Sequence, residues 1–559
     1  MAFVIVAAAT IAARLPFLLH ADRFFDSDEA VEGLMARHVL LGEHPLFLWG
    51  QRYKGVPEVY LSAAVFHWIP STAASVVAVV ALKAVTLACF AAFACLNFWL
   101  LTRLFNRRIS WIATSLLIVC PPSLTLWSLS GSAEIVMSLI AGTVLCLGID
   151  AWRRSGSRAW LVAAAAACGF GLWVQQYILY YVVALAVAAI DLTPQGRARF
   201  RTLVAARSLP ASVRLTLRFV VVAAGLYIVL GIAAFLGHGF DVTLLGVPIS
   251  VTHPQKMWWI AAALLLVSVA GLIGGRLAWS DSKTTPRAWL APALGFLAGY
   301  SPALVGHFLS DGVGAPMARM DLAGLRSAMS PLVRIALPIV FGFKSPTTER
   351  LAVPAWSALI IGAALVASYI RMRQTEQAPF APVFHVFLIA TPIVFIISGA
   401  YIDAQSYRYL MPLHAALPVV YAVGIDGTLR SNRIAGVALL TSLLALFALQ
   451  QATWYQRLEP DREARAIVGC LDRSGIRTAY ADYWLSYKLT FLTGERVIVA
   501  PVGGVDRYAP YTLSVRAQPS SPTIERLPAG SGEAFSCQTI IRSPTFTDGA
   551  ETSRPHRAP

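Results

Sequence analysis

The sequence predicts an all-α polytopic membrane protein with about 13 transmembrane helices and a small C-terminal α/β domain outside the membrane. The first observation is the composition. Of 559 residues, 57% are hydrophobic and 13% are charged, whereas soluble domains carry roughly 25% charged residues. The second is that apolar runs close to the ~20 residues needed to cross a bilayer recur along the chain. Residues 76–101, 257–275, 353–370 and 434–448 are examples.

The third observation is the placement of the basic residues. The net charge is +16, but Lys and Arg gather in alternate loops between the apolar runs instead of on one soluble face. This is the positive-inside pattern, which predicts that these six loops are cytoplasmic and argues against nucleic-acid binding. The loops contain Arg103/Arg107/Arg108, Arg153/Arg154/Arg158, Arg197/Arg199/Arg201/Arg207/Arg214, Arg276/Lys283/Arg287, Arg371/Arg373 and Arg430/Arg433.

These two patterns together place the helices and the orientation. Thirteen crossings put the N-terminus in the cytoplasm and everything after about Tyr455 outside. The first run, residues 1–19, lacks the basic start and the small-residue cleavage site of a secretory signal, so we expect it to be the first helix. The predicted helices cover roughly 2–20, 73–100, 110–128, 133–151, 159–174, 176–191, 217–236, 257–275, 288–309, 353–370, 381–399, 410–426 and 434–453.

The chain is expected to divide into a transmembrane catalytic domain over 1–454, an extracytoplasmic α/β domain over 455–542 and a disordered tail over 543–559. Within the first domain, the outer loop 20–72 is too long to be a simple connector, and a second long loop covers 310–352. In the C-terminal domain the pattern predicts a helix at 461–474, a strand at 477–481, a helix at 484–493 and a strand at 496–500.

Seven cysteines occur in the chain, and two of them lie in the outer C-terminal region. Cys470 and Cys537 form no metal-binding motif. An oxidising compartment would permit a disulfide between them, and the sequence leaves that question open.

The first outer loop carries five acids within eleven residues: Asp22, Asp26, Asp28, Glu29 and Glu32. The apolar spacing from Asp28 to Leu41 predicts an amphipathic helix on the membrane surface. Asp26 and Glu29 fit a capping box at the start of this helix, so structure alone can explain them. Asp28 has no capping duty, which favours a functional role.

Further charged and aromatic residues stand at the outer ends of the predicted helices. Arg52, Tyr53, Lys54 and Glu58 follow the amphipathic segment. Glu58 is the acid among them, and an acid near the membrane boundary is energetically costly unless it has a charged partner or a functional role. The two cations read equally well as interfacial anchors.

Two more outer positions attract attention. Glu134 begins the fourth predicted helix, where a carboxylate also suits the helix dipole. Arg408, beside Tyr409, is one of few basic residues on a short outer loop. A guanidinium can hold a phosphate in bidentate fashion, or can contact lipid headgroups without specificity.

Several of these segments resemble the GT-C membrane glycosyltransferases, and most of all the protein O-mannosyltransferase and aminoarabinose-transferase (family-39-like) branch. The similarity lies in Asp28-Glu29, in Gly50-Gln51-x-Tyr53-x-Gly55-x-x-Glu58, in Gly131–Glu134, in Arg408–Pro412 and in Tyr480–Trp484. It spans most of the chain. In the aminoarabinose branch, a lysine followed by paired prolines lies in the first loop, and this sequence departs from that pattern at Gly55-Val56-Pro57.

The resemblance implies transfer of a sugar from a polyprenyl-phosphate donor to a hydroxyl of an acceptor protein, lipid or glycan on the extracytoplasmic face, with inversion. It makes Asp28 the general base, beside Glu29 and Asp26. Substrate contacts are then expected from Arg52, Tyr53, Lys54, Glu58, Glu134, Arg408 and Tyr409. No cofactor is demanded, although a divalent cation is compatible with the residues. The implied location is the bacterial cytoplasmic (inner) membrane.

The rival interpretation is a lipid or glycan transporter or flippase without transferase activity. That class predicts inverted repeats, broken helices and charges near the bilayer midplane. Here the notable charges gather at the outer face instead. A third class, a binding protein that uses the C-terminal domain, would place Tyr480–Trp484 at a carbohydrate surface; the same residues also suit the core of a small α/β unit.

Overall fold

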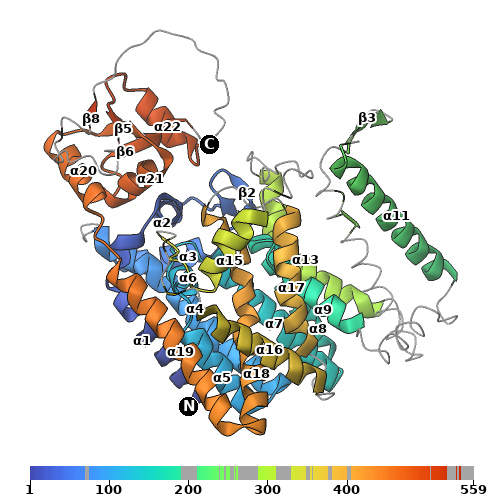
Figure 1. The fold of residues 1–559 in the computed structure, drawn as a ribbon. Helices are drawn as coiled ribbons and strands as arrows, with labels where there is room; N and C mark the ends of the chain where they lie inside the picture. Colours follow the sequence, from blue (N-terminus) through green and yellow to red (C-terminus); the bar gives the residue numbers. More distant parts are fainter. Residues whose placement is uncertain are drawn as a thin grey trace.

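The structure is a computed structural model, and its fold is a helical body with a small mixed sheet at one end (Figure 1). It describes residues 1–69, 75–190, 211–237, 240–244, 247–251, 257, 260–261, 287–309, 326, 329–347, 350, 353–354, 357–374, 381–398, 404–503, 505–525, 537 and 541–542. The predicted helix 257–275 lies almost entirely outside these residues, and so does the predicted disordered tail 543–559.

Most helices of the body follow the predicted order with small changes at their ends. They are α1 (Ala2–Leu18), α2 (Ser27–Leu40), α3 (Pro57–Phe66), α4 (Ser75–Leu104), α5 (Arg107–Ile118), α6 (Pro122–Trp127), α7 (Glu134–Ser155), α8 (Arg158–Val174), α9 (Ile178–Ile190), α11 (Ala211–Phe235), α13 (Arg287–Leu309), α15 (Leu337–Val340), α16 (Ala358–Gln374), α17 (Ala381–Ser398), α18 (Leu417–Ser431) and α19 (Arg433–Gln456). Shorter turns are η1 (Ala21–Phe24), the π-helix η2 (Leu332–Ala336) and the 3₁₀-helix η4 (Ala404–Ala415). The predicted helix 410–426 is wrong in its first part, because residues 404–415 form a 3₁₀-helix and the α-helix begins at Leu417 after a 45° bend.

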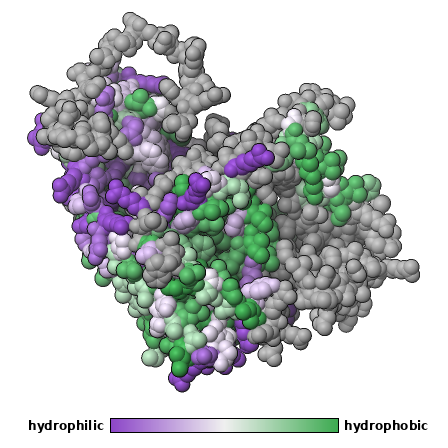
Figure 2. Space-filling view, in the orientation of Figure 1, coloured by the Kyte–Doolittle hydropathy of each residue, from purple (hydrophilic) through white to green (hydrophobic). Residues whose placement is uncertain are grey.

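Three of the described helices, α4, α7 and α19, are long and apolar enough to cross a membrane. The pair η4 and α18, bent by 45°, makes a fourth if it is counted as one span. Shorter apolar helices include α1, α8, α16 and α17. Figure 2 shows hydrophobic residues over the helical body, with hydrophilic residues gathered near the C-terminal domain and at the opposite end. The count of 13 crossings stays a prediction.

The predicted helix 110–128 is broken. It ends at Ile118 and resumes at Pro122, because Pro121 and Pro122 lack the N–H groups that would continue it. The carbonyls freed at the break have partners in other helices. Arg14 of α1, which is fully buried, donates from Nη1 to the Ile118 carbonyl at 2.7 Å, and Gln451 of α19 donates to the Cys120 carbonyl at 2.6 Å. Two side chains from distant helices therefore compensate a kink in a third.

The helices α8 and α13 pack closely through small residues. Gly295 and Gly299 lie four residues apart on α13, the spacing that lets two helix backbones approach. A Cβ atom on Gly299 would lie 2.1 Å from the Ala166 carbonyl oxygen of α8. Any larger residue at this position would force the two helices apart.

The helix α2 does not lie on the membrane surface as expected. It packs between α3 and α21 (Tyr483–Leu492) of the C-terminal domain. Leu34 and Met35 are fully buried, and a Cβ on Gly33 would meet the Phe491 ring at 2.4 Å. The expectation is wrong because the C-terminal domain covers the face of α2 that was predicted to meet lipid headgroups. In Figure 1, α2 lies beneath this domain.

A short antiparallel hairpin, β1 (Phe47–Leu48) and β2 (Gln51–Gly55), follows α2 in the outer loop, and a second hairpin pairs β3 (Asp241–Leu244) with β4 (Val247–Ser250). The C-terminal domain contains α20 (Arg462–Arg473), β5 (Thr478–Ala481), α21, β6 (Ile498–Pro501), α22 (Ala509–Arg516), β7 (Thr523–Ile524) and β8 (Ile541–Arg542). Its sheet has the order β6-β5-β7-β8, in which β5 is parallel to both neighbours. The two helices and two strands predicted there are confirmed.

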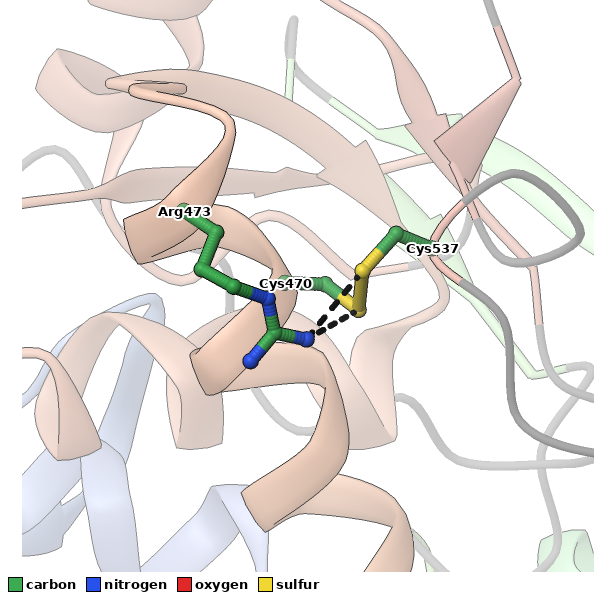
Figure 3. The surroundings of a disulfide bond; sticks show 3 residues. All are labelled: Cys470, Arg473 and Cys537. Atoms are coloured by element: carbon green, nitrogen blue, oxygen red, sulfur yellow. Dashed lines mark hydrogen bonds between the residues drawn. A yellow bond between two sulfur atoms is a disulfide. The ribbon is translucent and has the colours of Figure 1, made fainter.

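The disulfide that the sequence left open is present between Cys470 of α20 and Cys537 (Figure 3). Arg473 contacts both sulfur atoms, at 3.5 Å and 3.3 Å. The bridge ties the end of the chain to α20 across a sequence separation of 67 residues.

Candidate active site

The three acids at the start of α2 have three different environments. Asp26 is the N-cap of the helix, and its side chain accepts a hydrogen bond from the Glu29 backbone N–H at 3.0 Å. Glu29 does not complete the expected capping box. Its carboxylate lies 2.5 Å from Lys83 Nζ and accepts from the Gly131 N–H at 2.7 Å. Asp28, on the next face of the same turn, keeps 28% of its side chain exposed.

Glu29 and Lys83 form a buried ion pair between the outer loop and the helix α4. Lys83 is fully buried and Glu29 is 3% exposed. Burial raises the pKa of Glu29 to about 7, although Lys83 opposes the shift. Because every charge-assisted contact of this carboxylate is made inside the protein, the geometry assigns Glu29 to structure rather than to proton transfer.

Asp28 faces two guanidinium groups from opposite parts of the chain. Arg408 Nη1, from η4, lies 3.8 Å from Oδ2, and Arg507 Nη2, from the C-terminal domain, lies 3.6 Å from Oδ1. The hydroxyl of Tyr483, at the start of α21, donates a hydrogen bond to Oδ1. A partly exposed carboxylate is thus surrounded by two cations and one hydroxyl donor.

Contacts around the two arginines fix their positions. Arg507 Nε lies 3.1 Å from the Tyr483 hydroxyl, and the Arg507 backbone N–H donates to Tyr487 at 2.6 Å. Arg408 lies over the Tyr409 ring at 5.3 Å. Burial, together with the negative charge of Asp28, raises the pKa of Tyr483, so this hydroxyl stays protonated and remains a donor.

A second group of charged residues lies deeper, next to this site. Lys54 Nζ of β2 lies 2.8 Å from Glu32 and 3.3 Å from Glu134. It also donates to the Ser132 hydroxyl at 2.7 Å. Glu58, at the start of α3, completes the group. One carboxylate oxygen from each of the three glutamates lies within 4.8 Å of the others, so the three could hold a cation.

Burial dominates the electrostatics of this group. It raises the pKa of Glu32 to about 7 against the opposing effect of Lys54, and it raises the pKa of Glu58 well above its ordinary value. The pKa of Lys54 is also raised, because the neighbouring glutamates outweigh burial. A buried lysine that faces carboxylates on several sides is poorly placed to meet a donor phosphate directly.

The structure brings most of the predicted site residues together. Asp26, Asp28 and Glu29 share the first turn of α2, with Arg408 against Asp28, while Lys54, Glu58 and Glu134 form the deeper group. Tyr409 stacks beside Arg408, and Tyr53 lies near it, since the pKa of Tyr53 is raised by burial and then by Tyr409. Arg52 follows Gln51 on β2, and the contacts described here do not assign it a role.

Sequence reasoning did not name four residues that contact the acids of this region as site residues: Glu32, Lys83, Tyr483 and Arg507. Lys83 had a usable signal, because it is a lone lysine inside an apolar run. Tyr483 belonged to a quoted motif but was read as domain core. Arg507 stands in a loop without any pattern. Only the docking of the C-terminal domain on α2 brings the last two to Asp28.

Comparison with known proteins gives matches in fold only. No family model and no curated protein matches the sequence. The oligosaccharyltransferase of Archaeoglobus fulgidus in its apo form matches with a TM-score of 0.48 and 14% identity over 94% of this chain and 69% of that one. The same enzyme with zinc and sulfate gives 0.47 and 12%, over 89% of this chain. This chain spans 62% of the length of that protein.

ArnT from Cupriavidus metallidurans, bound to undecaprenyl phosphate, matches with a TM-score of 0.47 and 12% identity, over 94% of this chain and 90% of that one. The matches are to GT-C fold glycosyltransferases, as the sequence resemblance led us to expect. Their identities and TM-scores are low.

Proposed function

We propose that the chain is a membrane glycosyltransferase that moves a sugar from a polyprenyl-phosphate donor to an acceptor hydroxyl on the extracytoplasmic face, with Asp28 as general base. The observation that carries the proposal is the partly exposed Asp28 carboxylate between Arg408 and Arg507. One negative and two positive charges leave a net positive charge at a site built from the outer ends of helices. Such a site attracts an anion that arrives from the membrane surface.

The distances favour an additional ligand at this site. Both guanidinium groups lie 3.6–3.8 Å from Asp28, beyond ordinary hydrogen-bond length. Their N–H donors are therefore not used up by Asp28. A phosphate ester bound beside Asp28 would receive charge-assisted hydrogen bonds from them, which are the strong kind.

The same arrangement suits the chemistry of sugar transfer. An acceptor hydroxyl takes the place that Tyr483 holds on Asp28 Oδ1, gives its proton to the carboxylate and attacks the anomeric carbon. The bond from that carbon to the phosphate oxygen breaks, and the lipid phosphate leaves with the electron pair. Arg408 and Arg507 stabilise the charge that develops on it. Attack opposite the leaving group inverts the anomeric centre.

The test is transfer from a panel of radiolabelled undecaprenyl-phosphate sugars by the full-length chain in nanodiscs. Asp28→Asn keeps the shape of the side chain but removes the base, and should lower the rate by about 10²–10⁴-fold. Asp22→Asn is the matched control, because Asp22 pairs with Arg465 away from the site and should turn over like the wild type. Equal rates for wild type and Asp28→Asn would sink the assignment of the base.

A further inference from the structure

The deeper group of Glu32, Glu58, Glu134 and Lys54 lacks charge balance. Three carboxylates face one ammonium, and all four side chains are buried, with exposed fractions between 1% and 7%. Buried charges are costly unless a partner neutralises them. When all three carboxyl groups are ionised and Lys54 is protonated, two negative charges are left without a counter-charge among the described residues.

Three carboxylate oxygens of this group lack hydrogen-bond partners. Lys54 and Ser132 contact Oε1 of Glu32 and Oε2 of Glu134. The other oxygen of Glu32 and both oxygens of Glu58 are buried and have no hydrogen-bond partner in the described part of the chain. Glu58 is only 1% exposed, so bulk water does not solvate it.

A proton shared directly between Glu32 and Glu58 would not satisfy these atoms. One shared proton could satisfy at most two of the three free oxygens, and it would cancel only one of the two charges. The spacing suits an ion instead. Oxygen ligands lie roughly 2.0–2.6 Å from Mg²⁺ or Ca²⁺, so two ligands of one ion can stand up to about 4–5 Å apart. The three carboxylates fall within 4.8 Å of one another.

We propose that Glu32, Glu58 and Glu134 form a divalent-cation site, with Lys54 as a fixed cation that contacts two of its three ligands. The donor set is carboxylate oxygen only, which selects hard cations such as Mg²⁺, Mn²⁺ or Ca²⁺. One divalent ion cancels the two uncompensated charges. It would also join α2, α3 and the start of α7, which supply one ligand each. This inference does not depend on the proposed transfer reaction.

The experiment is a Mn²⁺ titration of the chelator-treated, full-length chain in nanodiscs, with free Mn²⁺ followed by electron paramagnetic resonance. We expect one ion per chain, and a rise in melting temperature that follows its binding. Glu58→Gln preserves the shape of the side chain and should weaken Mn²⁺ binding by more than about tenfold. Asp28→Asn should bind Mn²⁺ like the wild type even where it fails to transfer sugar, which separates this site from the proposed base.

Three outcomes would overturn the proposal. The wild type could bind no stoichiometric Mn²⁺ at millimolar concentration, and would then rely on protons or a buried water. Wild type and Glu58→Gln could bind equally, which would place the ion elsewhere. Finally, Lys54→Gln could bind Mn²⁺ where the wild type does not, which would mean that the ammonium fills the site on its own.

Discussion

Asp28 at the outer end and Asp150 and Asp426 at the opposite end all face two arginines, but the arrangements differ. Asp150 lies 2.7 Å from Arg103 and 2.9 Å from Arg154. Asp426 lies 2.8 Å from Arg430 and 3.6 Å from Arg108. These two aspartates are buried, while their arginines are 29–59% exposed. At Asp28 the carboxylate is 28% exposed, the arginines are 24% and 10% exposed, and the distances lengthen to 3.6–3.8 Å.

The difference separates ion pairs that hold helices together from one that is open to a ligand. At the opposite end each buried carboxylate makes at least one close contact with an arginine, and the arginines themselves are largely exposed. At Asp28, the cations are held inside the protein and the carboxylate reaches solvent. The same residue types therefore serve anchoring in one place and binding in the other, and exposure distinguishes them.

The largest effect on stability is expected for Lys83→Met. This variant tests whether Glu29, although it neighbours Asp28, belongs with the ion pairs that hold helices together. Removing Lys83 leaves a buried carboxylate unpaired, a loss of roughly 3–5 kcal/mol in stability. The loss should shrink in acid, because the pKa of Glu29 is about 7 and a protonated Glu29 needs no cation. Thermal unfolding at several pH values measures it. The double variant Lys83→Met/Glu29→Gln should recover stability. If Lys83→Met alone were as stable as the wild type, Glu29 would not be part of a stabilising ion pair.

The next largest effect is expected for Arg507→Gln, which tests whether the arginines at Asp28 bind a ligand. A charged hydrogen bond contributes roughly 1.5–3 kcal/mol, so transfer should slow by about 10–100-fold. The melting temperature should change little, because Asp28 can still be solvated. Initial rates against donor concentration provide the measurement, with Arg496→Gln as control, since Arg496 pairs with Asp472 on the domain surface. A large fall in stability without a loss of rate would make Arg507 an anchor instead.

Asp150→Asn should lower stability slightly and leave the transfer rate unchanged, which is the reverse of the result expected for Arg507→Gln. Its arginines can turn to water, so the stability loss should be only about 1 kcal/mol. The transfer rate should match wild type. Calorimetry and the transfer assay on the same preparation measure both quantities. A variant that loses transfer but melts normally would contradict the claim that Asp150 serves only to hold helices together.

The smallest effect concerns His38, which contacts Glu43 just after α2 at 2.7 Å and joins α2 to the C-terminal domain through Glu495 at 2.9 Å. Burial lowers the pKa of His38, but the two carboxylates outweigh it, and the pKa rises above 6.5. The stabilisation is therefore complete below the ordinary pKa and is lost as pH rises through the folded-state value. The difference in melting temperature between wild type and His38→Gln should fall as pH rises. A constant difference would exclude titration of His38 as its source.

Most of the helical body could be predicted from the sequence. Apolar runs located α1, α7, α8, α13, α17 and α19 to within a few residues, because lipid-length hydrophobicity is a local property. The break before Pro122 was not predicted. The prediction followed the continuous apolar composition and gave no weight to the two prolines at 121 and 122. The position of α2 was also missed, because what covers it comes from more than 400 residues further along the chain.

The site shows the same division. Asp28 stood out because no local structural duty explained it. Its partners Tyr483 and Arg507 could not be inferred, because contacts across about 450 residues leave no spacing in the sequence. Lys54 was expected to contact substrate, and that remains a prediction. Its place among three carboxylates could not be foreseen without the positions of α2, α3 and α7.

The buried Arg14 has a consequence for the order of assembly. Its partners are the carbonyls of Leu117 and Ile118 and the hydroxyl of Ser128, all made more than a hundred residues later during synthesis. When α1 is first synthesised, this guanidinium has none of these partners. An arginine inside an inserting helix is unfavourable, by about 2.5–3.5 kcal/mol at the helix centre, and Arg14 lies in the second half of α1. The position of α1 is therefore stabilised only after α5 and α6 have been synthesised and have packed against it.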